Sequence, residues 1–298
     1  MNSISKLLLL SAIFTGFALK SQAQVNPFQT MYFQNRYLSN PAMAGLDKGF
    51  NLNINYRQPW NSFPGAPKTG SLTAEYHATD KVGLGINVNN DEAGLFKSTR
   101  IIGTYAYHLP LNEKNEHLSF GISFGVNNSR IDYSKVDGDQ TDDAIAQYNQ
   151  LKPFVDGDLG IAYSGTNLYL GATMPNLRST LEKANNEHYD ANGTKFIGIA
   201  SYKIPLQDDA GFIFEPLAAF RVLKGYDNVF DAGANLTMAN YGVYVQGVYH
   251  TNKTVGLGLG WDQPSYALNF GYNHGTGPMS NYITSGFELG LKIKLFNK

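Results

Sequence analysis

Six histidines are the side chains of this sequence best suited to bind a metal or to move a proton. They are His77, His108, His117, His188, His250 and His274. None lies at a metal-ligand spacing from another histidine or from a carboxylate, and most fall at the ends of predicted strands or in turns. A water-facing imidazole is the simpler account of such positions, so the sequence predicts no cofactor and no histidine metal site.

The acidic stretch Asp137–Asp143, with the sequence DGDQTDD, gathers carboxylates around a glycine. Such a cluster resembles a calcium-binding loop, whose ligands are oxygen atoms. The stretch lacks a glutamate at the closing position, and a solvated acidic loop is the commoner arrangement. Calcium binding by this loop therefore stays open.

Enzyme motifs are missing from the sequence. It contains no G-x-S-x-G, no H-E-x-x-H and no Walker loop, and the absence of cysteine removes thiolate chemistry and disulfides. Ser98 and His108 share a predicted strand but stand too far apart along it to form a nucleophile pair. The run GLGLG alternates within a strand and has no helix after it, so it is not a phosphate cradle. We expect a protein that is not an enzyme.

Composition and the first residues narrow the class of protein. The chain has 298 residues and a net charge of -1, which disfavours nucleic acid as a partner. It has 19 Tyr, 18 Phe and 31 Gly, a mixture that fits many strands better than helices. Lys6, the apolar run Leu7–Leu19 and the small residues Ser21 and Ala23 form a secretory signal pattern. We predict a signal peptide over residues 1–23, removed after export.

Strict alternation of polar and apolar residues dominates the chain from Phe50 onward. In FNLNINYR, Phe50, Leu52, Ile54 and Tyr56 alternate with three asparagines and Arg57. This period of two is typical of strands with one apolar and one polar face. We expect about fourteen strands, over residues 49–58, 69–77, 81–90, 98–109, 117–127, 155–164, 166–174, 194–204, 210–223, 228–239, 241–251, 253–262, 265–274 and 284–296.

So many long strands avoid open edges by closing into an antiparallel barrel. A soluble barrel would turn its apolar face inward, whereas an outer-membrane barrel turns it toward lipid around a polar lumen. The strand lengths favour the transmembrane barrel, as do aromatic residues near strand ends and the aromatic near the C-terminus. The girdle candidates are Tyr56, Trp60, Tyr249, Trp261, Tyr266 and Tyr272.

Long links 128–154 and 175–193 alternate with tight turns, which predicts a periplasmic N-terminus. Pro216 inside a predicted strand indicates a bulge or a misplaced boundary.

Residues 24–48 precede the first strand and follow neither strand nor helix periodicity. Tyr32, Phe33, Tyr37 and Leu38 supply apolar surface, and Asn40-Pro41 supplies a turn. We expect this segment to plug the lumen or to lie across its periplasmic mouth, with residues 49–298 forming the barrel. A disordered tether is the alternative.

The same region carries a motif. NPFQTMYFQNRYLSNPAMAG, followed by a strand ending in Tyr-Arg-x-x-Trp and a Phe-x-Gly-Ala-Pro turn, resembles the PorP/SprF family of the Bacteroidetes type IX secretion system. The likeness is sharp over roughly Pro27 to Tyr76. The candidate partner-binding or structural residues are Tyr37, Asn40, Pro41, Gly45, Tyr56, Arg57, Trp60, Phe63, Gly65 and Pro67.

The resemblance implies an outer-membrane barrel that helps to export or anchor a partner surface protein, such as a gliding adhesin with a C-terminal sorting domain. It also implies contact with periplasmic and outer-membrane components of the secretion machinery, besides the lipid bilayer. A porin or a hydrophobic-solute channel like the fatty-acid transporters is the alternative, because strand number does not separate the two classes. An outer-membrane lipid enzyme would need a nucleophile constellation that the sequence lacks.

Overall fold

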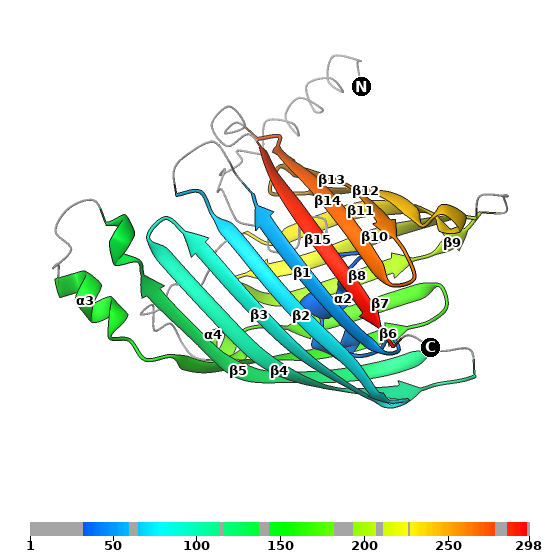
Figure 1. The fold of residues 1–298 in the computed structure, drawn as a ribbon, viewed down its shortest axis with the longest axis horizontal. Helices are drawn as coiled ribbons and strands as arrows, with labels where there is room; N and C mark the ends of the chain where they lie inside the picture. Colours follow the sequence, from blue (N-terminus) through cyan, green and yellow to red (C-terminus); the bar gives the residue numbers. More distant parts are fainter. Residues whose placement is uncertain are drawn as a thin grey trace, which may run out of the picture.

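The protein was analysed as a computed structural model, which describes residues 32–59, 65–113, 116–136, 143–181, 193–206, 211–225, 227–277 and 285–296. Fifteen strands in these ranges form a single sheet, and the two-residue β9 is an annex of it, which leaves fourteen long strands (Figure 1). The strands are β1 (Phe50–Gln58), β2 (Lys68–Thr79), β3 (Val82–Ala93), β4 (Phe96–Pro110), β5 (His117–Ile131), β6 (Phe154–Ser164), β7 (Leu168–Met174), β8 (Thr194–Tyr202), β9 (Ile204–Pro205), β10 (Phe212–Leu223), β11 (Val229–Met238), β12 (Val243–His250), β13 (Thr254–Asp262), β14 (Tyr266–Gly275) and β15 (Ser285–Leu295).

The sheet closes on itself. Strand β1 pairs antiparallel with β2 on one side and with β15 on the other, and β10 pairs with both β8 and β11. Among the described residues, each of the fourteen long strands pairs with a neighbour on both sides, so the backbone groups of the wall find partners within the wall. The predicted all-β antiparallel barrel of fourteen strands is confirmed.

Short helices accompany the barrel: α2 (Arg36–Ser39), η1 (Pro41–Met43), η2 (Tyr133–Lys135), α3 (Asp143–Asn149), α4 (Leu177–Leu181) and η3 (Ala239–Tyr241). The sequence did not predict α3 and α4, because helices of seven and five residues are too short to show a helical period. Among the described residues, no helix has the length and apolar character needed to span a bilayer.

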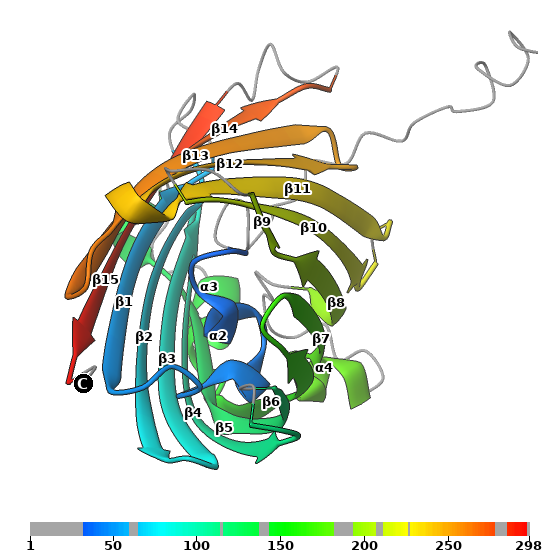
Figure 2. The same ribbon diagram turned by 90° about the vertical axis from the view of Figure 1, so that its right-hand side faces the viewer.

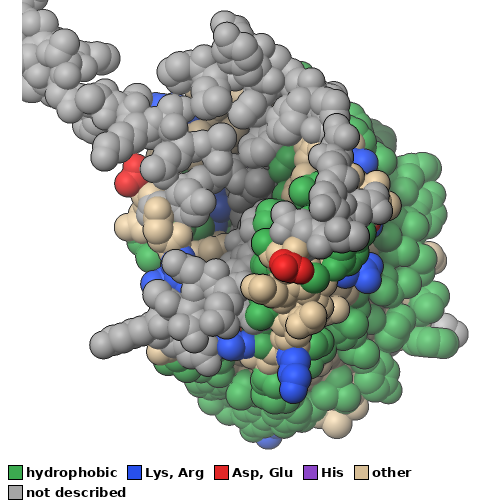
Figure 3. Space-filling model, turned by 90° about the vertical axis from the view of Figure 1, so that its left-hand side faces the viewer, with side chains coloured by type: hydrophobic (Ala, Val, Ile, Leu, Met, Phe, Trp, Pro, Cys, Tyr) green, Lys and Arg blue, Asp and Glu red, His purple; other side chains and the backbone are tan. Residues whose placement is uncertain are grey.

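The wall turns its apolar side outward. In β1, Ile54 and Tyr56 are exposed while Asn53, Asn55 and Arg57 are buried in the interior. Figure 3, seen from the end that carries α3, shows hydrophobic side chains covering much of the outer wall. Such a surface is stable only against lipid, since water would not solvate it, and the predicted orientation of the barrel is confirmed.

Aromatic side chains lie on the outer wall, as in the aromatic girdles that outer-membrane barrels have at both membrane interfaces. Tyr56, Tyr249, Trp261, Tyr266 and Tyr272 are all exposed. The rings of Trp261 and Tyr266 meet edge-on with centroids 6.0 Å apart. Trp60 lies outside the described residues.

Strands β3 to β5 extend beyond the apolar band. β4 and β5 have 15 residues each, and the outward face of their outer ends is polar. Lys97 pairs there with Asp132 at 2.8 Å, and Lys135 pairs with Glu92 at 3.0 Å. Ion pairs of this kind need water, so this end of the sheet rises out of the lipid.

The two ends of the barrel differ, as expected. Long links, over residues 132–153 and 175–193, join strands at one end, called here the long-loop end, although the links 94–95 and 251–253 at that end are short. At the other end, called the short-turn end, residues 80–81, 165–167 and 263–265 suffice. This asymmetry is typical of outer-membrane barrels, whose short turns face the periplasm.

Pro216 proves to lie well inside β10, so the predicted strand boundary was not at fault. It pairs in register with Ala234 of β11. On its other side, pairing with β8 stops at Leu217 and pairing with β9 begins at Phe214. The proline therefore lies where the neighbouring ladder is interrupted and where its missing N–H costs least. The register shift of β10 falls elsewhere, between Val222 and Leu223.

Candidate functional site

Residues 32–49, called here the lumenal segment, lie inside the ring of strands. Figure 2, a view from the short-turn end, shows α2 within that ring. The local sequence explains the fold. The Asn35 side chain accepts a hydrogen bond from Leu38 N at 3.1 Å and so begins α2. Asn40 Oδ1 accepts one from Ala42 N at 2.9 Å, and Pro41 opens η1. Gly45 ends the turn with a φ of 64°.

Two tyrosines hold the segment to opposite parts of the wall. The Tyr37 hydroxyl is 2.7 Å from the Thr104 hydroxyl of β4. The Tyr32 hydroxyl donates to the Asp231 carboxylate of β11. Both side chains are buried, and burial raises the pKa of Tyr32 and of Tyr37 well above the ordinary value of 10.0. Both phenols therefore stay protonated and bonded at physiological pH.

Asp231 is the centre of a buried charge cluster. Besides Tyr32, it accepts hydrogen bonds from Arg221 Nε at 2.8 Å and from His250 Nδ1 at 2.6 Å. These side chains are almost fully buried. A carboxylate in that setting is stable only with several donors, so the cluster anchors the start of the segment to β10, β11 and β12.

Glycines in the opposite wall let the segment come into backbone contact with the strands. A Cβ on Gly121 of β5 would lie 2.2 Å from the Pro41 carbonyl carbon, and one on Gly83 of β3 would lie 1.9 Å from the Ala44 carbonyl oxygen. Ala42 and Ala44, the small residues of the motif, are completely buried at this contact. The Asn-Pro-Ala-x-Ala-Gly element is thus matched in size to a wall without side chains.

Two histidines bond the backbone carbonyls of the same turn. His108 Nε2 donates to Ala44 O at 3.0 Å while its Nδ1 lies 2.9 Å from the Ser119 hydroxyl. His77 Nδ1 donates to Gly45 O at 2.9 Å. This role could not be predicted from the sequence, because the carbonyls come from a segment far away in the chain and no motif marks the pairing. His108 is buried, contrary to the expectation of a water-facing imidazole.

The middle of the segment crosses the lumen. Arg36 forms an ion pair with Glu215 of β10 at 2.7 Å, and its guanidinium lies 4.3 Å from the centroid of the Tyr169 ring of β7. Asn40 Nδ2 donates to Ile161 O of β6 at 3.0 Å. The segment is therefore held by strands on both sides of the barrel.

A polar cavity lies on each side of the segment. The long-loop cavity, of 110 Å³, lies between the segment and β1 to β6, and Asn87, Asn89 and Arg100 are among its lining residues. The short-turn cavity, of 610 Å³, lies toward β10 to β15, and Lys292 and Lys294 line it. Both lysines of the last strand thus face the lumen and not the lipid.

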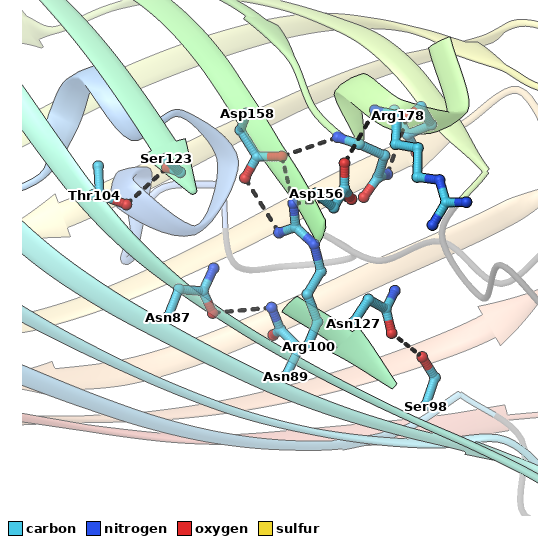
Figure 4. Close-up of polar contacts among 12 residues, drawn as sticks. Asn87, Asn89, Ser98, Arg100, Thr104, Ser123, Asn127, Asp156, Asp158 and Arg178 are labelled. Atoms are coloured by element: carbon cyan, nitrogen blue, oxygen red, sulfur yellow. Dashed lines mark hydrogen bonds and ion pairs between the residues drawn. The ribbon is translucent and has the colours of Figure 1, made fainter. Parts of the chain in front are cut away.

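An ion-pair network borders the long-loop cavity (Figure 4). Arg100 of β4 bonds Asp158 of β6 at 2.7 Å and Asp156 at 3.3 Å. The same carboxylates accept the backbone N–H groups of Asn176 at 2.9 Å and Arg178 at 3.1 Å. The network therefore ties the start of α4 to the inner wall. No group of residues among those described could hold a metal ion, and Asp137–Asp142 of the acidic loop lie outside them.

The structure brings some of the predicted site residues together and separates others. Tyr37, Asn40, Pro41 and Gly45 meet in the lumenal segment. Arg57 points inward and bonds Thr69 at 3.0 Å, whereas Tyr56 points outward toward lipid. Gly65 accepts a backbone hydrogen bond from Gly94 at 2.9 Å, and Pro67 lines the long-loop cavity. Trp60 and Phe63 lie outside the described residues.

The apolar outer wall, the polar interior and the closed antiparallel sheet define an outer-membrane β-barrel. Residues 21–293 match the family of the type IX secretion system membrane protein PorP/SprF, and the chain belongs to that family. The resemblance seen in the motif around Asn40 is thereby confirmed.

The chain is similar to several solved barrels, at very low sequence identity and with low TM-scores. A mutant of the TodX monoaromatic hydrocarbon channel is 10% identical, with a TM-score of 0.46 over 87% of this chain and 93% of that one. The KdgM porin is 8% identical, with a TM-score of 0.38 over 82% and 99%. A Rh. blastica porin mutant is 8% identical, with a TM-score of 0.35 over 83% and 99%. No curated protein matches the chain.

Proposed function

We propose that the protein is a non-enzymatic barrel of the type IX secretion system that assists the secretion or surface anchoring of a partner protein. The partner class is a cell-surface, gliding-adhesin-like protein with a C-terminal sorting domain. Family membership supports this proposal. The observation that carries it is the lumenal segment, which is held by both walls where a diffusion porin needs an open path.

The proposed arrangement in the cell follows from the two ends of the barrel. Residues 1–23 are a signal peptide, residues 24–48 form a segment that plugs the lumen, and residues 49–298 form the barrel. The short-turn end faces the periplasm and the other secretion components, while the long-loop end faces outward. The lengths of the links support this orientation.

Deletion of the gene tests the function directly. Mass spectrometry of proteins shaved from the surface of intact cells would compare the deletion strain with the same strain carrying the wild-type gene. We expect one or a few large surface proteins to disappear and to return on complementation. A mild-detergent pull-down from the native outer membrane should contain the same proteins. An unchanged surface proteome, with only lipids and general porins in the pull-down, would contradict the proposal.

Conductance separates this function from the porin alternative. A lumen crossed by its own N-terminal segment should give small or no single-channel currents in planar bilayers, and deletion of residues 24–48 should raise them. Large currents from the wild-type protein would favour a diffusion channel instead.

A further inference from the structure

The long-loop cavity is lined by groups that suit one class of ligand. Amide side chains such as Asn55, Asn87 and Asn89 and hydroxyls such as Ser98 and Ser123 are the commonest polar groups of the lining. Three cationic and four acidic side chains nearly cancel in charge. A lining of this kind offers hydrogen bonds of both senses without attracting ions of one sign.

Two donors at this cavity have no partner among the described residues. Asn55 Nδ2 and Arg100 Nε are both buried and unbonded, although the other two nitrogens of Arg100 bond Asp156 and Asp158. Asn55 is only 6% exposed. Buried donors without acceptors are costly, so the cavity is suited to a ligand that brings oxygen acceptors.

The same strands already bind a peptide one layer deeper in the lumen. Thr73 of β2 accepts from Asn35 Nδ2 at 3.0 Å, and Thr104 of β4 bonds Tyr37. The next inward-facing residue of each strand, two positions nearer the long-loop end, lines the cavity. In β2 this residue is Ser71. The cavity thus continues the surface that holds the lumenal segment.

We propose that the long-loop cavity binds one or two residues of the exported partner's polypeptide chain, beside the lumenal segment. Peptide carbonyls would accept from Asn55 and Arg100, and peptide N–H groups would donate to the asparagine and serine oxygens. A sugar would favour flat aromatic faces, and Tyr37 is the only aromatic among the described lining residues. The inference rests on the proposed function, because that function supplies the polypeptide.

A pair of single-cysteine variants tests the inference, since the chain contains no natural cysteine. Asn89→Cys places a thiol on the cavity wall. Asn90→Cys is the matched control, because Asn90 is exposed and, as the next residue of β3, points to the opposite side of the sheet. Intact cells are treated with a maleimide–benzophenone and illuminated, and the cross-linked products are sequenced by mass spectrometry. Heat-modified migration in gels confirms that both variants are folded barrels.

We expect Asn89→Cys to cross-link to a stretch of a secreted surface protein that Asn90→Cys does not capture. We also expect that maleimide modification of the cysteine in Asn89→Cys, made before the partner protein is exported, reduces surface display of that partner. The same modification of Asn90→Cys should not reduce it. The inference is overturned if Asn89→Cys attaches only to glycan, lipid or its own chain and display is unaffected by the modification. Surface display of the partner protein is also compared between cells with and without the gene for this barrel. If display is lost without the gene, the proposed function stands even though the inference fails. If display persists in the deletion strain, the proposed function is refuted as well.

Discussion

Replacing Gly121 by alanine should loosen the lumenal segment without harming the barrel wall. The added Cβ would lie 2.2 Å from the Pro41 carbonyl carbon and 2.3 Å from Ala42 N. Both atoms belong to the backbone, so no side-chain rotation relieves the clash. The segment must move away from β5, and the hydrogen bond from Asn40 Nδ2 to Ile161 O at 3.0 Å is the first contact at risk.

The size of the effect follows from the cost of overpacking, which is roughly 1–3 kcal/mol for an added methyl in a tightly packed site. If that energy is lost from docking alone, the undocked population of the segment rises roughly 5-fold to 150-fold, at about 1.4 kcal/mol per factor of ten. Backbone amides in η1 should exchange faster by the same factor. The N–H of Met43, bonded to Asn40 O at 3.0 Å, is a suitable reporter.

Hydrogen exchange with mass spectrometry on the detergent-purified barrel measures this change. Gly103→Ala is the matched control, because a Cβ at that β4 glycine would have its nearest neighbour, Phe124 O, at 4.0 Å. Fast exchange of residues 37–45 in Gly121→Ala, with unchanged exchange in Gly103→Ala, is the expected result. Equal exchange in the two variants would refute the idea that close backbone contact holds the segment.

Three further changes probe the other contacts. His108→Ala leaves Ala44 O without its donor, which costs about 1–3 kcal/mol, so exchange of the turn should rise while His274→Ala, at an exposed position, has no effect. Asp231→Asn removes the counter-charge of buried Arg221 and should lower the free energy of unfolding in urea by about 3–5 kcal/mol, more than replacing both residues by leucine does. The raised pKa of Tyr32 predicts that its bond to Asp231 is intact below pH 10.0 and is lost only as the pH rises through the higher folded value. After correction for intrinsic exchange, protection of the segment should therefore be constant from neutral pH to about pH 9, and a loss of protection near neutral pH would contradict this.

Alternation allowed the wall to be predicted, because in a strand the side of each residue follows from its position alone. Ile54 outside and Asn53 inside are direct readings of that rule. The ends of β4 and β5 were underestimated, since polar residues such as Asn128 break the apolar pattern while the backbone continues to pair. Strand pairing that continues beyond the membrane leaves no alternation of polar and apolar residues in the sequence, so it could not be predicted.

The site was predictable only in part. The Asn40-Pro41 turn could be recognised from local sequence, because capping and turn preferences act within a few residues. The partners of that turn could not. Gly121, His108 and Asp231 acquire their roles only when distant strands meet, and a single sequence carries no record of which strand faces which segment.

The hydrogen bond between Tyr32 and Asp231 joins residues 199 positions apart in the sequence. The pairing of β1 with β15 closes the barrel around the lumenal segment that contains Tyr32. The protein thus encircles its own beginning. Contacts so distant in sequence form late and slowly in folding. The machinery that inserts the barrel into the membrane must therefore work in one of two orders. It either closes the β1–β15 edge around a segment that is already inside, or keeps that edge open until the segment has entered.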